Sequence, residues 1–192
     1  MVDKIEKRYH QWTQGLEELP ARISIYSRVR DIPYAVVPEL NSTEKYGDIL
    51  KYGRGSCMPK HFLLCNMYQR LGMLVLFVVY PFRWDEMGIN FPPHLKKLAK
   101  AMPASYHLAC KAEIEGNLVL VDVTLDPALE RLGLPVNKEW DGLSNTLLPV
   151  IPCGEEEVHY PTEILFEQTP YDENTMAFYR ELNQWFDEVR TY

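Results

Sequence analysis

Three residues have the types and the order that catalysis by a thiol requires: Cys57, His107 and Asp122. A cysteine nucleophile needs a base to take its proton, and that base needs a partner that fixes its tautomer. The cysteine, the histidine and the aspartate supply these three parts in that order. The chemistry that this order predicts is attack by a thiolate on an electrophilic carbon.

The segment around Cys57 must place the thiol at the start of a helix. A glycine-rich turn, Gly53-Arg54-Gly55-Ser56, precedes the cysteine, and Gly72 marks the end of the helical pattern. Apolar residues recur between them at helical spacing, at Phe62, Leu63, Leu64, Met67, Tyr68 and Leu71. Unpaired N–H groups and the helix dipole would favour the thiolate there. The alternative is an ordinary buried cysteine on an apolar helix.

The other two residues fall in a predicted β-hairpin, residues 106–114 and 117–123, around Glu115-Gly116. A two-residue turn pairs Ile114 with Asn117. This register gathers one apolar face: Leu108, Cys110, Ala112, Ile114, Val119, Val121 and Val123. His107 and Asp122 then fall together on the other face as diagonal neighbours, near enough for a side-chain pair.

Two other uses of these side chains stay open. His61 follows Cys57 by one helical turn, so the two could form a dyad or a metal pair. His107 and Cys110 could add ligands for zinc, although Cys110 should face the opposite side of its strand. We expect no metal or other cofactor. Cys65 and Cys110 are interpreted as core residues and Cys153 as a loop thiol.

Composition limits the function classes. The chain has 192 residues, enough for one domain, with a formal charge of −7 and a pI near 5.3. No basic face is evident, which argues against nucleic acid as a partner. The longest apolar run, Met73 to Tyr80, is too short to cross a bilayer, so no membrane partner is expected. Four cysteines without CxxC spacing, and no secretory signal, predict a cytoplasmic protein with reduced thiols.

The remaining elements are predicted from periodicity. An amphipathic helix through Ile5, Tyr9, Trp12, Leu16 and Leu19 should end at Pro20, and a second should cover residues 21–30. The run at 73–80 predicts a strand covered on both faces. Residues 81–105 should form a mobile excursion that walls a cleft, and their basic patch at 94–100 should be a solvated face.

The C-terminal third is proline-rich and irregular over residues 124–170, with a possible strand near residues 146–151. Asp172 could cap a last helix. Its expected buried stripe is Met176, Tyr179, Leu182, Phe186 and Val189.

The sequence resembles the transglutaminase-like superfamily. Gly55-Ser56-Cys57, followed by Lys60 and a helix closing on Leu71-Gly72, is similar to the cysteine segment of that family. The hairpin with His107 and Asp122-Val-Thr124 is similar to its histidine and aspartate segments, and Ile32-Pro33-Tyr34 to its usual lead-in. The resemblance covers roughly residues 21–126.

The resemblance implies an α+β, papain-like fold in which the cysteine-bearing helix packs on an antiparallel sheet. Residues 1–192 would then form a single transglutaminase-like domain, with a core at about 21–126, an N-terminal helix and a C-terminal helical extension. It also implies that Cys57 is the nucleophile, His107 the base and then the acid, and Asp122 its orienter.

The implied activity is acyl transfer from an amide through a thioester, most simply as a hydrolase, amidase or peptidase. An acyltransferase to an amine and a catalytically inactive binding scaffold are the alternatives. The chain departs from the family where Ala109 replaces a common aromatic, and where Ser56 replaces the glutamine of the animal cross-linking enzymes. No calcium loop is recognisable.

The expected partner is a peptide or a small amide substrate. Arg54, Ser56 and Tyr106 are candidate substrate-binding residues by their proximity to the catalytic candidates, but each would equally suit a surface or packing role. Neither the substrate nor the oligomeric state follows from the sequence.

Overall fold

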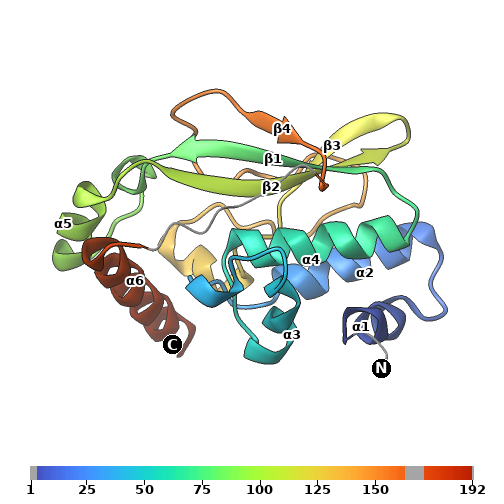
Figure 1. Cartoon of the computed structure of the whole chain (residues 1–192), viewed down its shortest axis with the longest axis horizontal. Coiled ribbons are helices and arrows are strands. Elements are labelled where there is room, and N and C mark those ends of the chain that lie inside the picture. Colours follow the sequence, from blue (N-terminus) through green and yellow to red (C-terminus); the bar gives the residue numbers. More distant parts are fainter. Residues whose placement is uncertain (1–3, 163–170, 192) are drawn as a thin grey trace.

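The computed structural model describes residues 4–162 and 171–191, which form an α+β fold (Figure 1). The helices are α1 (Lys4–Thr13), α2 (Glu18–Arg30), α3 (Ile49–Tyr52), α4 (Cys57–Arg70), α5 (Pro93–Ala101) and α6 (Glu173–Thr191). The strands are β1 (Val75–Phe82), β2 (Ser105–Ile114), β3 (Asn117–Val121) and β4 (Glu157–His159). They form one antiparallel sheet in the order β3-β2-β1-β4. The predicted α+β class is confirmed.

The hairpin of β2 and β3 has the register that the sequence predicts. Ile114 pairs with Asn117, and Cys110 pairs with Val121 further along the ladder. Glu115 and Gly116 both have positive φ, 51° and 79°, as a two-residue turn of this hand requires. All seven residues of the predicted apolar face belong to one buried cluster.

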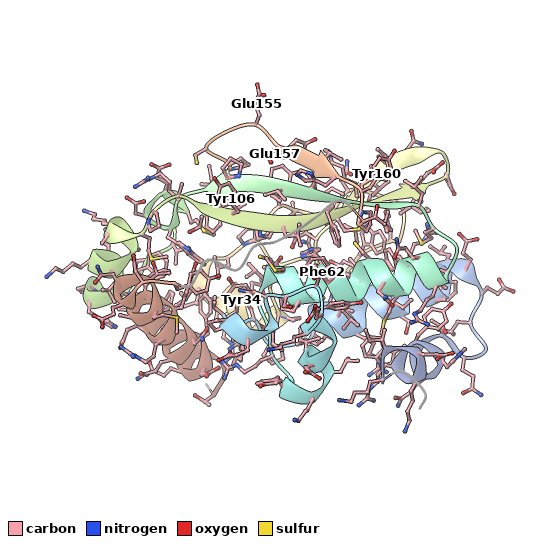
Figure 2. All side chains as sticks on the ribbon, viewed as in Figure 1. Tyr34, Phe62, Tyr106, Glu155, Glu157 and Tyr160 are labelled. Atoms are coloured by element: carbon pink, nitrogen blue, oxygen red, sulfur yellow. The ribbon has the colours of Figure 1, made fainter. Side chains whose placement is uncertain are left out.

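That cluster lies between the sheet and helices α2 and α4, which run beneath the sheet in Figure 1. The ring of Phe62 on α4 contacts that of Phe77 on β1, with centroids 4.9 Å apart, and Figure 2 shows Phe62 between helix and sheet. A second cluster covers the other face of the sheet with side chains from residues 84–102, 125–150 and α6. Along β1, Phe77 belongs to the first cluster and Val78 to the second, so the strand is covered on both faces as predicted.

The boundary between the two N-terminal helices differs from the predicted one. Helix α1 ends at Thr13, and the Leu16 N–H bonds to the Thr13 carbonyl in a turn. Pro20 lies inside the first turn of α2 rather than at a helix end. A proline is tolerated there because N–H groups of the first turn have no acceptor within the helix.

Residues 81–105 contain more regular structure than predicted. A 3₁₀ turn covers Trp84–Glu86, and α5 carries the basic patch on its solvent side, as expected. The predicted strand near residues 146–151 does not form. Instead β4 pairs with the free edge of β1, and its segment carries Glu157 and Tyr160 along the outer edge of the sheet (Figure 2). Residues 163–170 of the predicted irregular stretch lie outside the described residues.

Helix α6 begins where the sequence predicts. The Asp172 carboxylate accepts a hydrogen bond of 2.7 Å from the Thr175 N–H. The buried stripe agrees with the predicted one at Leu182 and Phe186, but it is shifted by one position in the first half of the helix. Its residues are Thr175, Phe178, Leu182 and Phe186, and Met176 is exposed. Within the described residues, no helix has the length and apolar character that crossing a membrane requires.

Candidate active site

The loop before Cys57 is fixed by packing against the segment that precedes α3. Tyr34 and Gly55 form a parallel bridge, in which the Ala35 N–H donates to the Gly55 carbonyl at 3.1 Å. A Cβ on Gly55 would lie 2.6 Å from the Ile49 Cδ1 atom. Only glycine therefore allows this close approach without displacing the Ile49 side chain.

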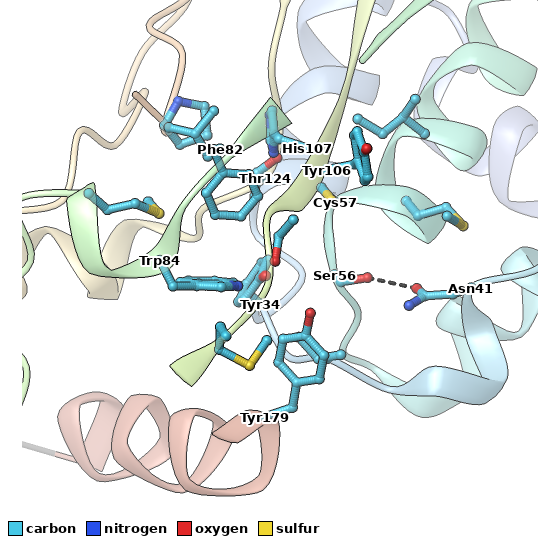
Figure 3. A pocket seen from close by; sticks show the side chains of 18 of the residues that line it. Tyr34, Asn41, Ser56, Cys57, Phe82, Trp84, Tyr106, His107, Thr124 and Tyr179 are labelled. Atoms are coloured by element: carbon cyan, nitrogen blue, oxygen red, sulfur yellow. Dashed lines mark hydrogen bonds between the residues drawn. The ribbon is translucent and has the colours of Figure 1, made fainter. Parts of the chain in front are cut away.

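Cys57 is the first residue of α4, as predicted, and Ser56 is the N-cap of this helix. The Cys57 N–H has no acceptor inside the helix because of its place in the first turn. It can therefore donate to an oxyanion that forms on a carbonyl bound at the sulfur. The Ser56 hydroxyl donates to the Asn41 side-chain oxygen at 2.8 Å (Figure 3), which fixes the residue next to the thiol.

His107 on β2 and Asp122, one residue past β3, form the pair that the register predicts. The distance between His107 Nε2 and Asp122 Oδ2 is 2.7 Å, and each residue is only 2% exposed. Asp122 Oδ1 accepts the Thr124 N–H at 2.9 Å, so both carboxylate oxygens have donors. The backbone N–H of Asp122 donates to the Thr146 hydroxyl at 2.8 Å.

The predicted surroundings of the pair need correction. Alternation along the two strands predicts that both side chains lie on the face opposite the apolar set. In the structure they contact His61 of α4: its Nε2 lies 3.7 Å from Asp122 Oδ2, and its ring centroid 6.1 Å from that of His107. The hairpin ladder ends at Val121, so alternation along β3 does not fix the direction of the next side chain.

Electrostatics favours the ion pair of His107 and Asp122. Burial opposes protonation of His107, but the charge of Asp122, its hydrogen bond and a hydrogen bond with the Cys57 side chain together raise the pKa of His107 to about 10. Burial would raise the pKa of Asp122, yet the charge of His107 and hydrogen bonds with His107 and the Thr124 N–H lower it overall. Because Nε2 faces Asp122, Nδ1 is the ring nitrogen left for the thiol.

This pair makes a prediction for stability against pH. The pKa of His107 is raised from 6.5 to about 10 on folding, so its contribution is complete below pH 6.5 and is lost as the pH rises through 10. The stability of the parent should fall relative to His107→Gln across that window, by on the order of 1 kcal/mol per pH unit. Urea denaturation at several pH values measures the difference.

The comparison with a variant is necessary because Lys60 titrates with the opposite sign. Its pKa is lowered to about 7 by burial, so its effect on stability overlaps the same window. The Lys60 effect is common to both proteins and cancels in the difference. A difference between parent and His107→Gln that stays constant from pH 6.5 to 10 would contradict the predicted imidazolium–carboxylate pair.

His61 serves as a structural cross-link, which removes the geometric basis for a Cys57/His61 dyad. Its Nδ1 donates to the Cys57 carbonyl at 2.8 Å, and its Nε2 accepts the Val123 N–H at 3.2 Å. With both ring nitrogens in these bonds the ring is neutral, and burial lowers its pKa to about 4. Among the described residues, no group of three or more His, Cys, Asp or Glu side chains could hold a metal ion.

Lys60 is a buried positioning residue, a role that the sequence did not predict. Its side chain is 0% exposed, and the ammonium donates to the carbonyls of Arg30, Ile32 and Thr124 at 2.8–2.9 Å. It thereby ties the start of α4 to the end of α2 and to the segment after Asp122. A lysine among the apolar residues of the helix was the available signal, but its partners lie far away in sequence.

Two of the three candidate substrate-binding residues line the cavity at Cys57, and the third has another role. Ser56 and Tyr106 line the cavity that contains the thiol, Tyr106 with 67% of its surface exposed. Arg54 is not among the described lining residues. It instead contacts both oxygens of Asp187 on α6, at 3.0 and 3.1 Å.

Arg54 belongs to a charged network that holds α6 against the loops of the site. Arg190 of α6 binds Asp126 through two hydrogen bonds, of 2.7 and 3.1 Å, and Asp187 through one of 2.9 Å. Arg190 also donates to the Tyr34 carbonyl, while Asp126 accepts the Tyr34 N–H, each at 2.8 Å. The network therefore joins α6 to the lead-in strand segment and to the chain after Asp122.

A cavity of about 970 Å³ opens at the thiol. Cys57 and His107 lie at one side of it, and Tyr34, Trp84 and Tyr179 line it further away (Figure 3). Residues 87–89 and 102–106 also line it, so the excursion after β1 does form a cleft wall. Part of α6 forms another wall. The size is that of a pocket for a small molecule or a side chain of a larger substrate.

Comparison with known proteins adds little to this geometry. No protein-family model matches the sequence, and curated proteins yield no match. A solved structure from Cytophaga hutchinsonii described as a "putative cysteine protease" aligns with a TM-score of 0.43 and 18% identity. The alignment covers 90% of this chain and 56% of that one, so the chain spans little more than half the length of that protein. Any function of this chain must therefore be inferred from the geometry of the site.

Proposed function

We propose that the protein is a cysteine-dependent acyl-transfer enzyme of transglutaminase-like type that hydrolyses an amide through a thioester. The observation that carries the proposal is the buried pair of His107 and Asp122, with Cys57 at a helix start beside it and a cavity at the thiol. A purely structural histidine would not need a free ring nitrogen directed at a cysteine on another element. The order of these parts along the chain also matches the resemblance in the sequence.

In the first step the Cys57 thiolate attacks the carbonyl carbon of the amide, with its proton already on His107. A C–S bond forms, and the Cys57 N–H donates to the oxyanion. The tetrahedral species then collapses, the C–N bond breaks, and His107 gives its Nδ1 proton to the leaving amine. Asp122 remains ionised and holds the ring through Nε2.

In the second step water attacks the thioester while His107 takes one of its protons. The C–S bond breaks, the carboxylic acid leaves, and the Cys57 thiolate and the His107 imidazolium are restored. Hydrolysis is favoured over transfer because no dedicated amine site was evident in the sequence and water is always present.

Selective labelling tests the thiol. At neutral pH, substoichiometric iodoacetamide should modify Cys57 before the other three cysteines, although Cys153 is the exposed one and Cys57 is only partly exposed. Peptide mapping by mass spectrometry gives the order. The matched control is Cys153→Ser, which should leave the rate at Cys57 unchanged. Modification of Cys153 first in the parent would remove the case for an activated nucleophile and favour the binding scaffold.

The fate of the acyl group separates a hydrolase from an amine acyltransferase. With a generic activated acyl donor and millimolar primary amine, we expect the free acid to be the main product, because water reaches the thioester through the open cavity. Liquid chromatography of the two products, with Cys57→Ala as the blank, measures the ratio. Amide as the dominant product would assign the protein to the acyltransferases.

A further inference from the structure

The cavity beyond the thiol is built mainly from apolar and aromatic side chains. Its far wall comes from the segment after β1 and from α6, with Phe82, Trp84, Met102, Tyr179 and Phe186 among the lining residues (Figure 3). The Trp84 ring contacts Phe82 and Phe178 with centroids 5.1 and 5.2 Å apart, so this wall is continuous with the second core cluster. Burying an apolar group of matching size against such a wall makes a favourable contribution to the free energy of binding.

The nearby cations are already paired with other groups of the protein, including the His107 imidazolium at the thiol side of the cavity, which is paired with Asp122. No lysine or arginine is among the described lining residues. Lys60 donates to three backbone carbonyls, and Arg54 and Arg190 pair with carboxylates of the α6 network. Glu157 is the one carboxylate among the described lining residues, and it lies on β4 with His159 3.5 Å away. A charged group deep in the cavity would therefore lose its hydration without gaining a counter-ion.

Two buried polar atoms in the lining have no hydrogen-bond partner among the residues that the structure describes. They are Nε1 of Trp84 and the hydroxyl oxygen of Thr124, in residues 6% and 4% exposed. Figure 3 shows the Trp84 nitrogen turned toward the cavity interior. The Tyr179 hydroxyl interacts electrostatically with the Trp84 N–H, but the two groups do not have the geometry of a hydrogen bond. Buried donors normally have a partner, so an acceptor on a ligand would satisfy this one.

We propose that the cavity receives the acyl group of the substrate, and that this group is bulky, uncharged and largely apolar, with a hydrogen-bond acceptor that meets Trp84 Nε1. The inference rests on the proposed function for the covalent step, in which the C–S bond to Cys57 forms as the bond to the leaving group breaks. A small acyl group such as acetyl would leave most of the cavity empty. A carboxylate-bearing group would be buried without a cation.

Matched p-nitrophenyl esters test the proposal in the parent protein. The acyl groups are acetyl, phenylacetyl, 4-carbamoylphenylacetyl and 4-carboxyphenylacetyl, of which the last two differ in charge and hardly in shape. Release of p-nitrophenolate gives the acylation rate, divided by the rate for N-acetylcysteine to remove intrinsic reactivity. We expect the carbamoyl compound to exceed both the acetyl and the carboxy compounds by about tenfold or more. Equal rates, or a faster carboxy compound, would overturn the proposal.

The Trp84→Phe variant tests the polar contact, since it keeps the aromatic ring and removes the N–H. The advantage of the carbamoyl over the phenylacetyl ester should fall by about two- to tenfold. Trp185→Phe is the matched control, because Trp185 lies on α6 outside the described lining of this cavity, and it should behave as the parent. An unchanged ratio in Trp84→Phe would refute the assigned contact. The ester series in the parent needs no variant and stays decisive if Trp84→Phe does not fold.

Binding to Cys57→Ala separates this proposal from the proposed function. Calorimetry with the carbamoyl and carboxy phenylacetamides measures the cavity without any covalent step. If no ester acylates the parent but the uncharged amide binds Cys57→Ala at least about tenfold more tightly, the enzyme proposal fails and the ligand class stands. If esters acylate Cys57 without preference, the ligand class fails and the enzyme proposal stands. If neither amide binds and no ester reacts, both fail.

Discussion

Replacing Asp122 by asparagine is expected to slow acylation of Cys57 by on the order of 10²–10⁴-fold in a protein that remains folded. The reason lies in the two oxygens of the carboxylate. Oδ1 accepts the Thr124 N–H at 2.9 Å, and this bond should hold the oxygen of an asparagine in the same place. The amide NH₂ would then face His107 Nε2 and donate to it. The imidazole would carry its proton on Nδ1, where it cannot accept one from the thiol.

Release of p-nitrophenolate from an activated ester as a function of pH measures the rate of Cys57 acylation, with circular dichroism to check the fold. Asp48→Asn is the matched control, since its carboxylate is partly exposed and pairs only loosely, at 3.6 Å, with Lys4. Asp122→Ala should slow the reaction as well and also lose about 1–3 kcal/mol of stability, because the Thr124 N–H then lacks its acceptor. A folded Asp122→Asn that reacts as fast as the parent at every pH would show that Asp122 only holds the hairpin.

The parts of the site that the sequence predicts correctly are those set by local patterns. The helix start at Cys57 follows from a glycine-rich turn and an apolar stripe, and the hairpin register from alternation around Glu115-Gly116. The pairing of His107 with Asp122 follows from that register, because only one alignment keeps the apolar face intact. The catalytic roles of these residues stay a prediction.

The parts that the sequence does not predict depend on partners far along the chain. The acceptors of Lys60 belong to two segments far apart along the chain, at the end of α2 and after Asp122, and no local pattern identifies a buried lysine as satisfied. Strand β4 comes after a long irregular stretch of the chain. No pattern in the sequence indicates that β1 has a free edge with which β4 can pair. Pro20 was predicted to end the first helix but lies in the first turn of α2, because proline suits a first turn as well as a helix end.

The resemblance to transglutaminase-like proteins left the C-terminal extension outside its range, yet the structure makes that extension part of the site. Tyr179 and Phe186 of α6 line the cavity, and Arg190 ties the helix to Asp126. The helix was predicted from its own periodicity. The contribution of α6 to a pocket at Cys57 could not be predicted, because the position of this helix depends on ion pairs with residues far away along the chain.

Those ion pairs make the second large prediction. Arg190→Met is expected to lower the free energy of unfolding by about 3–5 kcal/mol, because it leaves the buried Asp126 carboxylate without its hydrogen-bonded cation. Asp126 would keep its bond from the Tyr34 N–H, which does not neutralise its charge. Without the arginine the pKa of Asp126 should rise from the lowered value that Arg190 and the Tyr34 N–H now maintain. The deficit should therefore shrink as the pH falls and Asp126 becomes protonated.

Urea denaturation of Arg190→Met at neutral and acidic pH measures both effects. Arg180→Met is the matched control, since this arginine lies on the same helix with its side chain exposed, and it should cost less than about 0.5 kcal/mol. The double variant Asp126→Asn/Arg190→Met should recover part of the loss, because the asparagine can still accept the Tyr34 N–H and no buried charge remains. If Arg190→Met costs no more than the control, or if the double variant is the less stable of the two, the network does not hold α6 against the site. The cavity wall must then be maintained by the apolar contacts of Phe178, Leu182 and Phe186 alone.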